Sequence, residues 1–278
     1  MNVYALLSLF GYGVSTLFYL LYLLLNNKWF PRLAKGTVLI SFLFQSLFLL
    51  TLNIQRGQFG VFGQSESMLV FSWFMILGFF IIEHRIKTKF LGVLITPIAF
   101  LLCIIAYPLL EKGSYVLQGA QETFKSAWFP LHLLGSFFGE VLLILMAILG
   151  VFYLLQERQL KSRRPGFLLH RLPSLESTDR IMEKLLNWGF VFLTLGILSG
   201  GIWAHRVLAS QWTLDPKQFW ALVTWIVYAS MIFLRTRFHL KGKRGALLAI
   251  LGSLVVIFTF LGTNLIYDES HNFWKMTG

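Results

Sequence analysis

Eight runs of apolar residues divide the chain from end to end, and each is long enough, or nearly so, to cross a bilayer as a helix. The third and seventh runs are the shortest. We therefore predict an all-α, polytopic membrane helix bundle of about eight transmembrane helices that forms a single integral membrane domain over residues 1–278. The predicted spans are Val3–Leu25, Thr37–Ile54, Met68–Ile82, Phe90–Leu110, Ala127–Leu155, Leu185–Ala204, Phe219–Leu234 and Ala246–Ile266.

The composition supports a membrane protein. Of the 278 residues, 56% are apolar or aromatic and 13% are charged, and a soluble domain of this length could not bury so much apolar surface. The chain has a net charge of +12, but none of its basic segments carries a motif that reads nucleic acid. We therefore expect no nucleic-acid partner. The first run lacks a basic leader and a cleavage site, which indicates a retained span. The one cysteine, Cys103, is expected to be a small buried apolar residue.

Basic residues fall mainly on one side of the predicted bundle. Eighteen of the 24 Lys and Arg residues lie in alternate loops, among them Gln156–Lys184, the longest connection. The positive-inside rule makes that side cytoplasmic, and both termini then lie outside. We expect a multi-pass protein of the bacterial plasma (inner) membrane with its remaining loops on the external, periplasmic side.

Three features far apart in sequence share the external side. The polar stretch Ala209–Trp220 ("ASQWTLDPKQFW") joins spans six and seven, His132 lies at the outer end of span five, and His271 follows span eight. Two neutral imidazoles can fill both axial positions of heme iron, and indole rings can pack on a porphyrin. The alternative is ordinary interfacial behaviour, because tryptophan prefers a membrane boundary and a histidine there is usually solvated.

Several neighbouring residues bear on this choice. Asp215-Pro216 favours a turn that would hold Trp212 and Trp220 in a fixed relation. A histidine ligand needs an outer acceptor for its second nitrogen, and the sequence identifies none. His205 also lies on the outer side, whereas His84, His170 and His239 fall in basic loops. The candidate cations for pairing with heme propionates are Lys217, Arg206 and Lys125.

Polar residues inside the spans are further candidates. Glu140 follows His132 by eight residues and so points to a similar face, and a carboxyl at that depth is a functional candidate or a protonated group hydrogen-bonded within the bundle. Gln45 is a candidate partner for it. Pro97 and Pro108 are expected to bend or end the fourth span, and Gly200-Gly201 to allow close packing.

The segment "GGIWAHRVLASQWTLDPKQFWALVTWIVYASMIFLRTR" resembles the tryptophan-rich signature of the cytochrome c assembly proteins of the CcsA, CcmC and HemX type. In that family the loop reads WGxxWxWDPxExW, with one histidine upstream and one downstream, which His132 and His271 match. The resemblance covers about residues 97–273. It implies non-covalent heme b, with His132 and His271 as iron ligands and Trp212, Asp215, Lys217 and Trp220 as further binding residues. His205, Arg206 and Glu140 are additional candidates.

The loop also departs from the family pattern. Leu208-Ala209, Leu214 and Gln218 stand where the family often has Trp-Gly, a third tryptophan and an acidic residue. A platform with fewer indoles should cover less porphyrin, which favours the shorter HemX-like or YpjD-like members over a full synthase. No catalytic residue is assigned, and a heme chaperone or assembly factor is favoured over a stand-alone heme lyase.

The resemblance therefore implies that the chain binds heme at the external face and delivers it for cytochrome c maturation. An assembly partner protein would manage the thiols of the apocytochrome c. The alternative is a HemX-like regulator that controls the level of a tetrapyrrole-synthesis enzyme, glutamyl-tRNA reductase. A small-solute transporter is disfavoured because intramembrane charges are few and paired broken helices are not evident.

Overall fold

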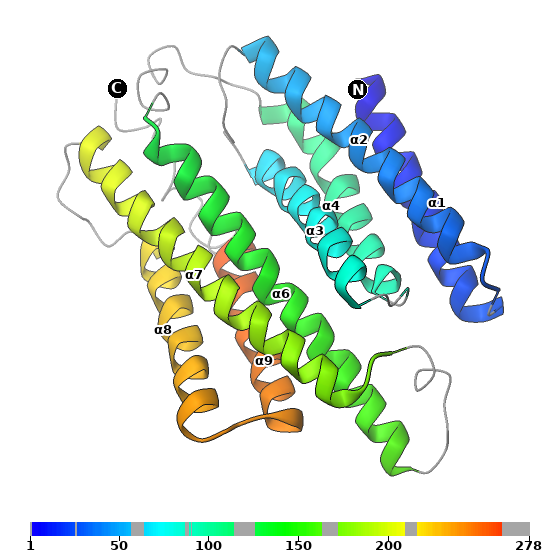
Figure 1. The fold of residues 1–278 in the computed structure, drawn as a ribbon. Helices are drawn as coiled ribbons and strands as arrows, with labels where there is room; N and C mark the ends of the chain where they lie inside the picture. The colour runs from blue at the N-terminus through cyan, green and yellow to red at the C-terminus, as the bar shows by residue number, and fades with distance from the viewer. Residues whose placement is uncertain are drawn as a thin grey trace. The chain divides into compact units, whose positions relative to one another are not determined.

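The computed structural model describes residues 2–25, 27–56, 64–86, 89, 91–113, 126–162, 172–208 and 216–262. All regular structure in these ranges is helical (Figure 1). Eight helices are long and apolar enough to cross a membrane, as the sequence predicts. They are α1 (Val3–Leu25), α2 (Phe30–Arg56), α3 (Gln64–Ile86), α4 (Gly92–Gly113), α6 (Trp128–Lys161), α7 (Leu175–Leu208), α8 (Pro216–Arg237) and α9 (Gly242–Ile257), the last continued by the π-helical turn η1 (Phe258–Gly262).

The helices extend beyond most of the predicted spans. The third and seventh, predicted to be short, contain 23 and 22 residues. The connection predicted to run from Gln156 to Lys184 is much shorter, because α6 continues to Lys161 and α7 begins at Leu175. Helical hydrogen bonding does not need apolar side chains, so a helix can continue into polar flanks that hydropathy excludes. Pro97 and Pro108 do not end α4, which contains both residues.

The chain forms two compact units, residues 1–124 and 125–278. In the first unit α1 packs on α2 and α4, and α3 packs on α4. Its core holds a polar network. The amide oxygen of Gln45 accepts a hydrogen bond from Tyr12 at 2.7 Å, and its nitrogen donates to Ser72 at 2.7 Å and to the Leu69 carbonyl at 3.1 Å. Gln45 is thus bonded within its own unit.

Cys103 lies in the same core, as predicted. Its thiol is fully buried and not in a disulfide, 3.4 Å from the Ser72 hydroxyl. Interhelical hydrogen bonds of this kind fix which helix faces meet where apolar contacts alone discriminate poorly.

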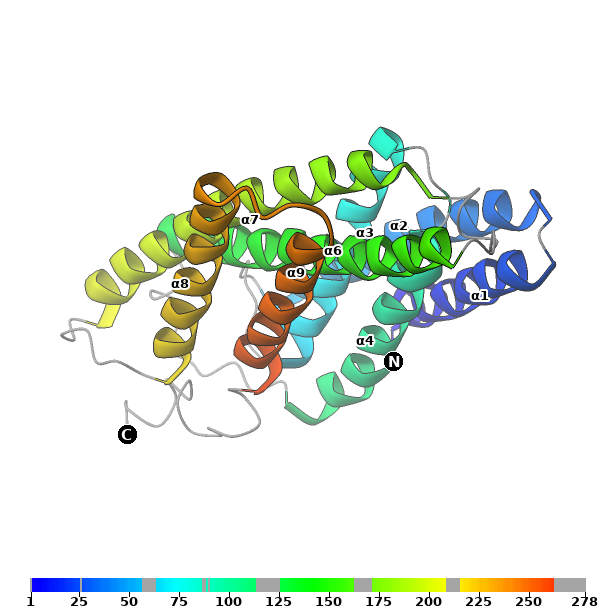
Figure 2. The same ribbon diagram turned by 90° about the horizontal axis from the view of Figure 1, so that it is seen from below.

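In the second unit the two longest helices, α6 and α7, lie side by side along much of their length (Figure 1). The helices α8 and α9 run next to each other beneath them, as the view turned by 90° also shows (Figure 2). Helix α9 packs mainly on α6, and α8 packs on α7. Most of α6 is buried by these neighbours, so it is the central helix of the unit.

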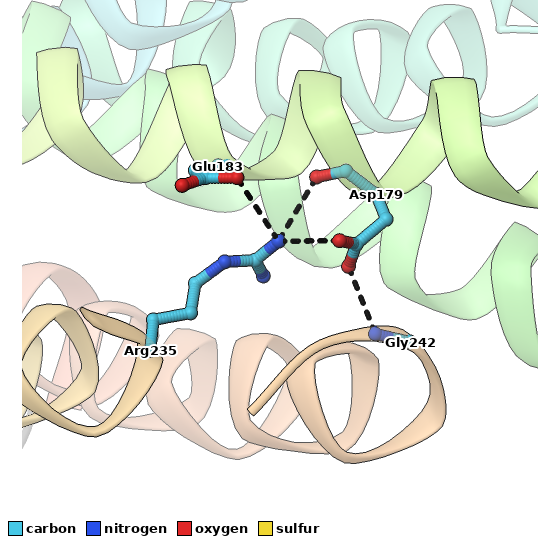
Figure 3. Close-up of polar contacts among 4 residues, drawn as sticks. All are labelled: Asp179, Glu183, Arg235 and Gly242. Atoms are coloured by element: carbon cyan, nitrogen blue, oxygen red, sulfur yellow. Dashed lines mark hydrogen bonds and ion pairs between the residues drawn. The ribbon is translucent and has the colours of Figure 1, made fainter. Parts of the chain in front are cut away.

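One buried ion-pair cluster ties α7 to the turn between α8 and α9 (Figure 3). The Arg235 Nη2 atom lies 2.8 Å from Asp179 Oδ2 and donates to the Asp179 carbonyl at 3.1 Å. The other carboxylate oxygen of Asp179 accepts the Gly242 N–H at 3.0 Å. A weaker contact of 3.9 Å joins Arg235 to Glu183. The Arg235 side chain is 7% exposed and that of Asp179 is 10% exposed, so this ion pair is buried.

Candidate functional site

Four helix termini gather at one end of the second unit. Phe129, at the start of α6, packs on Trp203 near the end of α7, with ring centroids 5.3 Å apart. Phe137 of α6 packs edge-on against Phe260 of η1 at 5.9 Å. Trp220, near the start of α8, packs on Phe258 at 4.5 Å. We refer to this end, formed by the first three turns of α6, the first two turns of α8, the last two turns of α7 and the turn η1, as the His132 end.

His132 lies in the second turn of α6 and is half-buried against α7. Its Nδ1 atom lies 2.7 Å from the carbonyl oxygen of Gly196. A carbonyl can only accept, so Nδ1 carries the proton and donates it. In the neutral ring Nε2 then carries the lone pair that a metal needs. Gly196 is thus the outer acceptor that the sequence did not identify, although its place in the small-residue run "GILSGG" was a signal for close helix packing.

Trp220 occupies the second turn of α8 and forms an aromatic cluster with Phe219 and Phe258. Its carbonyl oxygen accepts hydrogen bonds from the hydroxyls of Thr224 at 2.9 Å and Thr259 at 3.4 Å. Thr259 lies in η1, and π-helical turns are frequent at functional sites. The Trp220 backbone is thus hydrogen-bonded to η1, and its indole ring packs on Phe258 of the same turn.

Other predicted site residues lie wholly or partly outside the described residues. His271, Trp212, Asp215 and the candidate cation Lys125 fall outside them. Arg206 and Lys217 are placed within α7 and α8, but their side chains are not described. Helix α8 begins at Pro216, directly after Asp215, and proline is a common first helical residue. The chain leaves η1 at Gly262, nine positions before His271 in the sequence.

His205 lies away from the contact between His132 and Gly196. It follows Gly196 by nine residues, which is about two and a half helical turns, so it projects from the opposite face of α7. Its side chain is exposed, whereas Trp203 on the α6-facing side is buried. His205 therefore lies near the same end of α7, but on the face of that helix opposite to the one that contacts His132.

Glu140 lies deeper in α6 and is half-buried. It lies near Tyr228 of α8, a side chain that is fully buried. Ser136 lies between His132 and Glu140 along α6, with its hydroxyl 3.4 Å from His132 Nδ1. The three side chains thus recur every four residues along one side of α6, from the His132 end towards the middle of the helix.

The described residues at this end include residue types that heme binding uses. Among the described residues, no three His, Cys, Asp or Glu side chains gather as a metal-binding group. Heme requires only axial ligands from the protein together with apolar and aromatic contacts, because its other ligands belong to the porphyrin. Among the described residues, His132 offers one oriented imidazole and this end offers aromatic rings, which correspond to one axial ligand and to the aromatic contacts.

Comparisons with known proteins identify the family to which the chain is similar. The family model described as "Cytochrome C assembly protein" matches residues 61–271, a range that begins earlier than the resemblance seen in the sequence and reaches His271. The chain is 30% identical to the cytochrome c biogenesis protein CcsA of Chlamydomonas reinhardtii over 87% of its own length and 68% of the relative.

The CcsA proteins of Guillardia theta and Prochlorococcus marinus are 26% and 28% identical to the chain, with 96% and 92% of the chain and 92% and 87% of the relatives covered. The similarity therefore includes the first unit as well as the second. The family match covers most of the chain and contains six of the eight spans and His132, which leads to one conclusion: this membrane protein belongs to the cytochrome c assembly protein family.

Proposed function

We propose that this protein serves cytochrome c biogenesis by binding heme b at the external face of a bacterial plasma membrane and presenting it for attachment to apocytochrome c. His132 and His271 would be the axial ligands, and the Trp212–Trp220 segment would line the porphyrin. The observation that carries the proposal is the Nδ1–H···O bond from His132 to Gly196, since it leaves Nε2 as the ligating nitrogen at an aromatic helix terminus.

The distribution of charge supports the external placement. The opposite end of the second unit carries Arg158, Lys161, Arg180, Lys184 and Arg237 in the last turns of α6 and α8 and the first turns of α7. Basic residues favour the cytoplasmic side, so the His132 end would face outwards. Lys217 and Arg206, at the His132 end, would pair with the heme propionates.

The chain's own residues would bind, orient and protect heme rather than perform its attachment. Heme supplies the vinyl groups that become linked to the thiols of apocytochrome c. Cys103, the one cysteine of this chain, is buried between the helices of the first unit. An assembly partner would therefore hold the apocytochrome and keep its thiols reduced, and this chain would act as an assembly factor rather than a complete lyase.

Absorption spectroscopy tests the proposal directly. Protein purified after expression with ample heme should show a Soret band, and His132→Ala or His271→Ala should each remove most of it. Loss of a ligand should lower affinity by more than the ~10–100-fold typical for an outer partner. His84→Ala is the matched control, because that histidine is exposed in the last turn of α3, and it should keep the full band.

Two results would contradict the proposal. The first is colourless wild-type protein, which would exclude stable heme binding. The second is a deletion strain that makes normal amounts of c-type cytochromes while its level of glutamyl-tRNA reductase changes, which would favour the regulatory alternative. His205→Ala decides whether that residue is a ligand, and we expect it to retain the band because of its position on the opposite face of α7.

A further inference from the structure

We propose that Gly196 and Gly200 of α7 form a seat that holds His132 in the Nδ1–H tautomer and directs Nε2 to the ligand position. The role of the seat in heme binding rests on the proposed function. The seat itself is a feature of the heme-free chain. Neither glycine would touch the bound group. Both would act through His132, as positioning residues.

The first element of the seat is the carbonyl of Gly196. It lies 2.7 Å from His132 Nδ1, an ordinary hydrogen-bond distance between groups on two different helices. In a regular helix this carbonyl would be engaged by the N–H four residues later, which belongs to Gly200. A carbonyl has two lone pairs, so it can accept from both. The Ser199 hydroxyl also lies 3.2 Å from this oxygen, but its single proton has a closer acceptor in the Leu195 carbonyl at 2.5 Å. The Gly196 carbonyl therefore needs no break in α7 to bind the ring.

The second element is the missing side chain of Gly200. A Cβ atom at this position would lie 2.5 Å from His132 Nδ1 and 2.8 Å from its Cε1 atom. Any other residue would therefore push the imidazole away from the Gly196 carbonyl. Glycine at 200 thus makes the hydrogen bond sterically available, and Gly196 provides its acceptor.

The third element is the close approach of the two helices below the ring. A Cβ at Gly135 would lie 2.7 Å from the backbone nitrogen of Gly196, and one at Gly196 would lie 2.5 Å from the Ser136 hydroxyl. Helix α6 is thus pressed against α7 within one turn of His132. The ring cannot reach the carbonyl if this separation grows, so the glycines on both helices define its position.

The seat has a chemical consequence that packing alone would not require. In the Nδ1–H tautomer the lone pair is on Nε2, the nitrogen farther from the helix backbone. An outer hydrogen bond of this kind fixes ring orientation and raises the basicity of the ligating nitrogen.

The tautomer can be measured on heme-free protein labelled with ¹⁵N-histidine in detergent micelles. Long-range correlations from the ring protons distinguish a protonated Nδ1 from a protonated Nε2, and His132→Gln identifies the His132 signals by their loss. We expect the Nδ1–H form in the wild type. A wild-type ring protonated at Nε2 overturns the seat, and this measurement needs no variant to fold.

Two matched glycine substitutions then test its role. Gly200→Ala should disturb the Nδ1 signal and raise the dissociation constant for added hemin by ~10–100-fold. Gly189→Ala is the control: it faces Leu143 of the same α6–α7 interface at 2.8 Å, about 16 Å along α7 from Gly200. It should leave both the tautomer and hemin affinity unchanged.

The outcomes separate this inference from the proposed function. If Gly200→Ala alters the tautomer but hemin binds as tightly as before, the seat does not position a ligand and the inference fails. If both glycine variants weaken hemin binding equally, general loosening of the interface explains the effect and the inference also fails. If wild-type protein binds no hemin, the proposed function fails, while the ¹⁵N result still decides whether the seat exists.

Discussion

Arg235→Met is expected to lower the free energy of unfolding by about 3–5 kcal/mol, because it leaves the Asp179 carboxylate buried without its cation. The long apolar stem of methionine keeps much of the packing of the arginine stem, so the charge is the main change. Unfolding of the detergent-solubilised protein, followed by circular dichroism against temperature or denaturant, measures the difference. The effect should be large because Asp179 also holds the Gly242 N–H at the turn between α8 and α9.

Two further variants show whether the lost charge is the cause. Asp179→Asn combined with Arg235→Met removes both charges and keeps an oxygen for the Gly242 N–H, so it should be more stable than Arg235→Met alone. Arg180→Met removes an exposed partner of Glu176 at 3.3 Å and should cost about 0–0.5 kcal/mol. If Arg235→Met and Arg180→Met destabilise equally, the buried cluster does not stabilise the unit as described.

Gly139→Val is expected to prevent α6 and α7 from reaching their close packing distance. A Cβ at residue 139 would lie 2.7 Å from the backbone nitrogen of Leu193 and 3.0 Å from the Gly189 carbonyl. Backbone atoms cannot rotate away as a side chain can, so the helices must separate. We expect a loss at or above the upper end of the ~1–3 kcal/mol typical of overpacking. The loss can be measured by the same unfolding experiment.

Heme binding provides a second measurement for this variant. Since His132 reaches Gly196 only when the helices are close, Gly139→Val should also weaken the Soret band. Gly36→Val is the control, because a Cβ at residue 36 of α2 has nothing within 4 Å. Its stability and heme content should stay near those of the wild type. Equal losses in the two variants would indicate that added volume in any helix, rather than this helix contact, causes the effect.

The number and order of spanning helices could be read from the sequence because apolar length is a local property. The span Val3–Leu25 was predicted to the residue. The other ends were displaced where helices continue into polar flanks, as α7 does by starting at Leu175 rather than Leu185. Hydropathy reports the part of a helix that suits hydrocarbon, whereas hydrogen bonding decides where the helix ends.

The candidate site was predicted less completely. His132 and Trp220 were found because their residue types carry recognisable chemistry and the topology places them near one membrane surface. The partners Gly196 and Thr259 were not found, because a backbone carbonyl and a threonine hydroxyl have no sequence signature for these contacts. The pairing of Arg235 with Asp179 was not predicted either, because nothing in the chain order joins two residues that lie 56 positions apart.

By itself, then, the sequence determined that this chain is a membrane helix bundle of the cytochrome c assembly type, with histidines and tryptophans as its candidate heme residues. Only the tertiary structure decided which backbone carbonyl His132 Nδ1 contacts, which face of α7 receives the ring, and which cation Asp179 binds. The physical reason is that hydrophobicity and residue chemistry belong to individual segments. Hydrogen bonds, ion pairs and close glycine contacts exist only after distant helices have packed together.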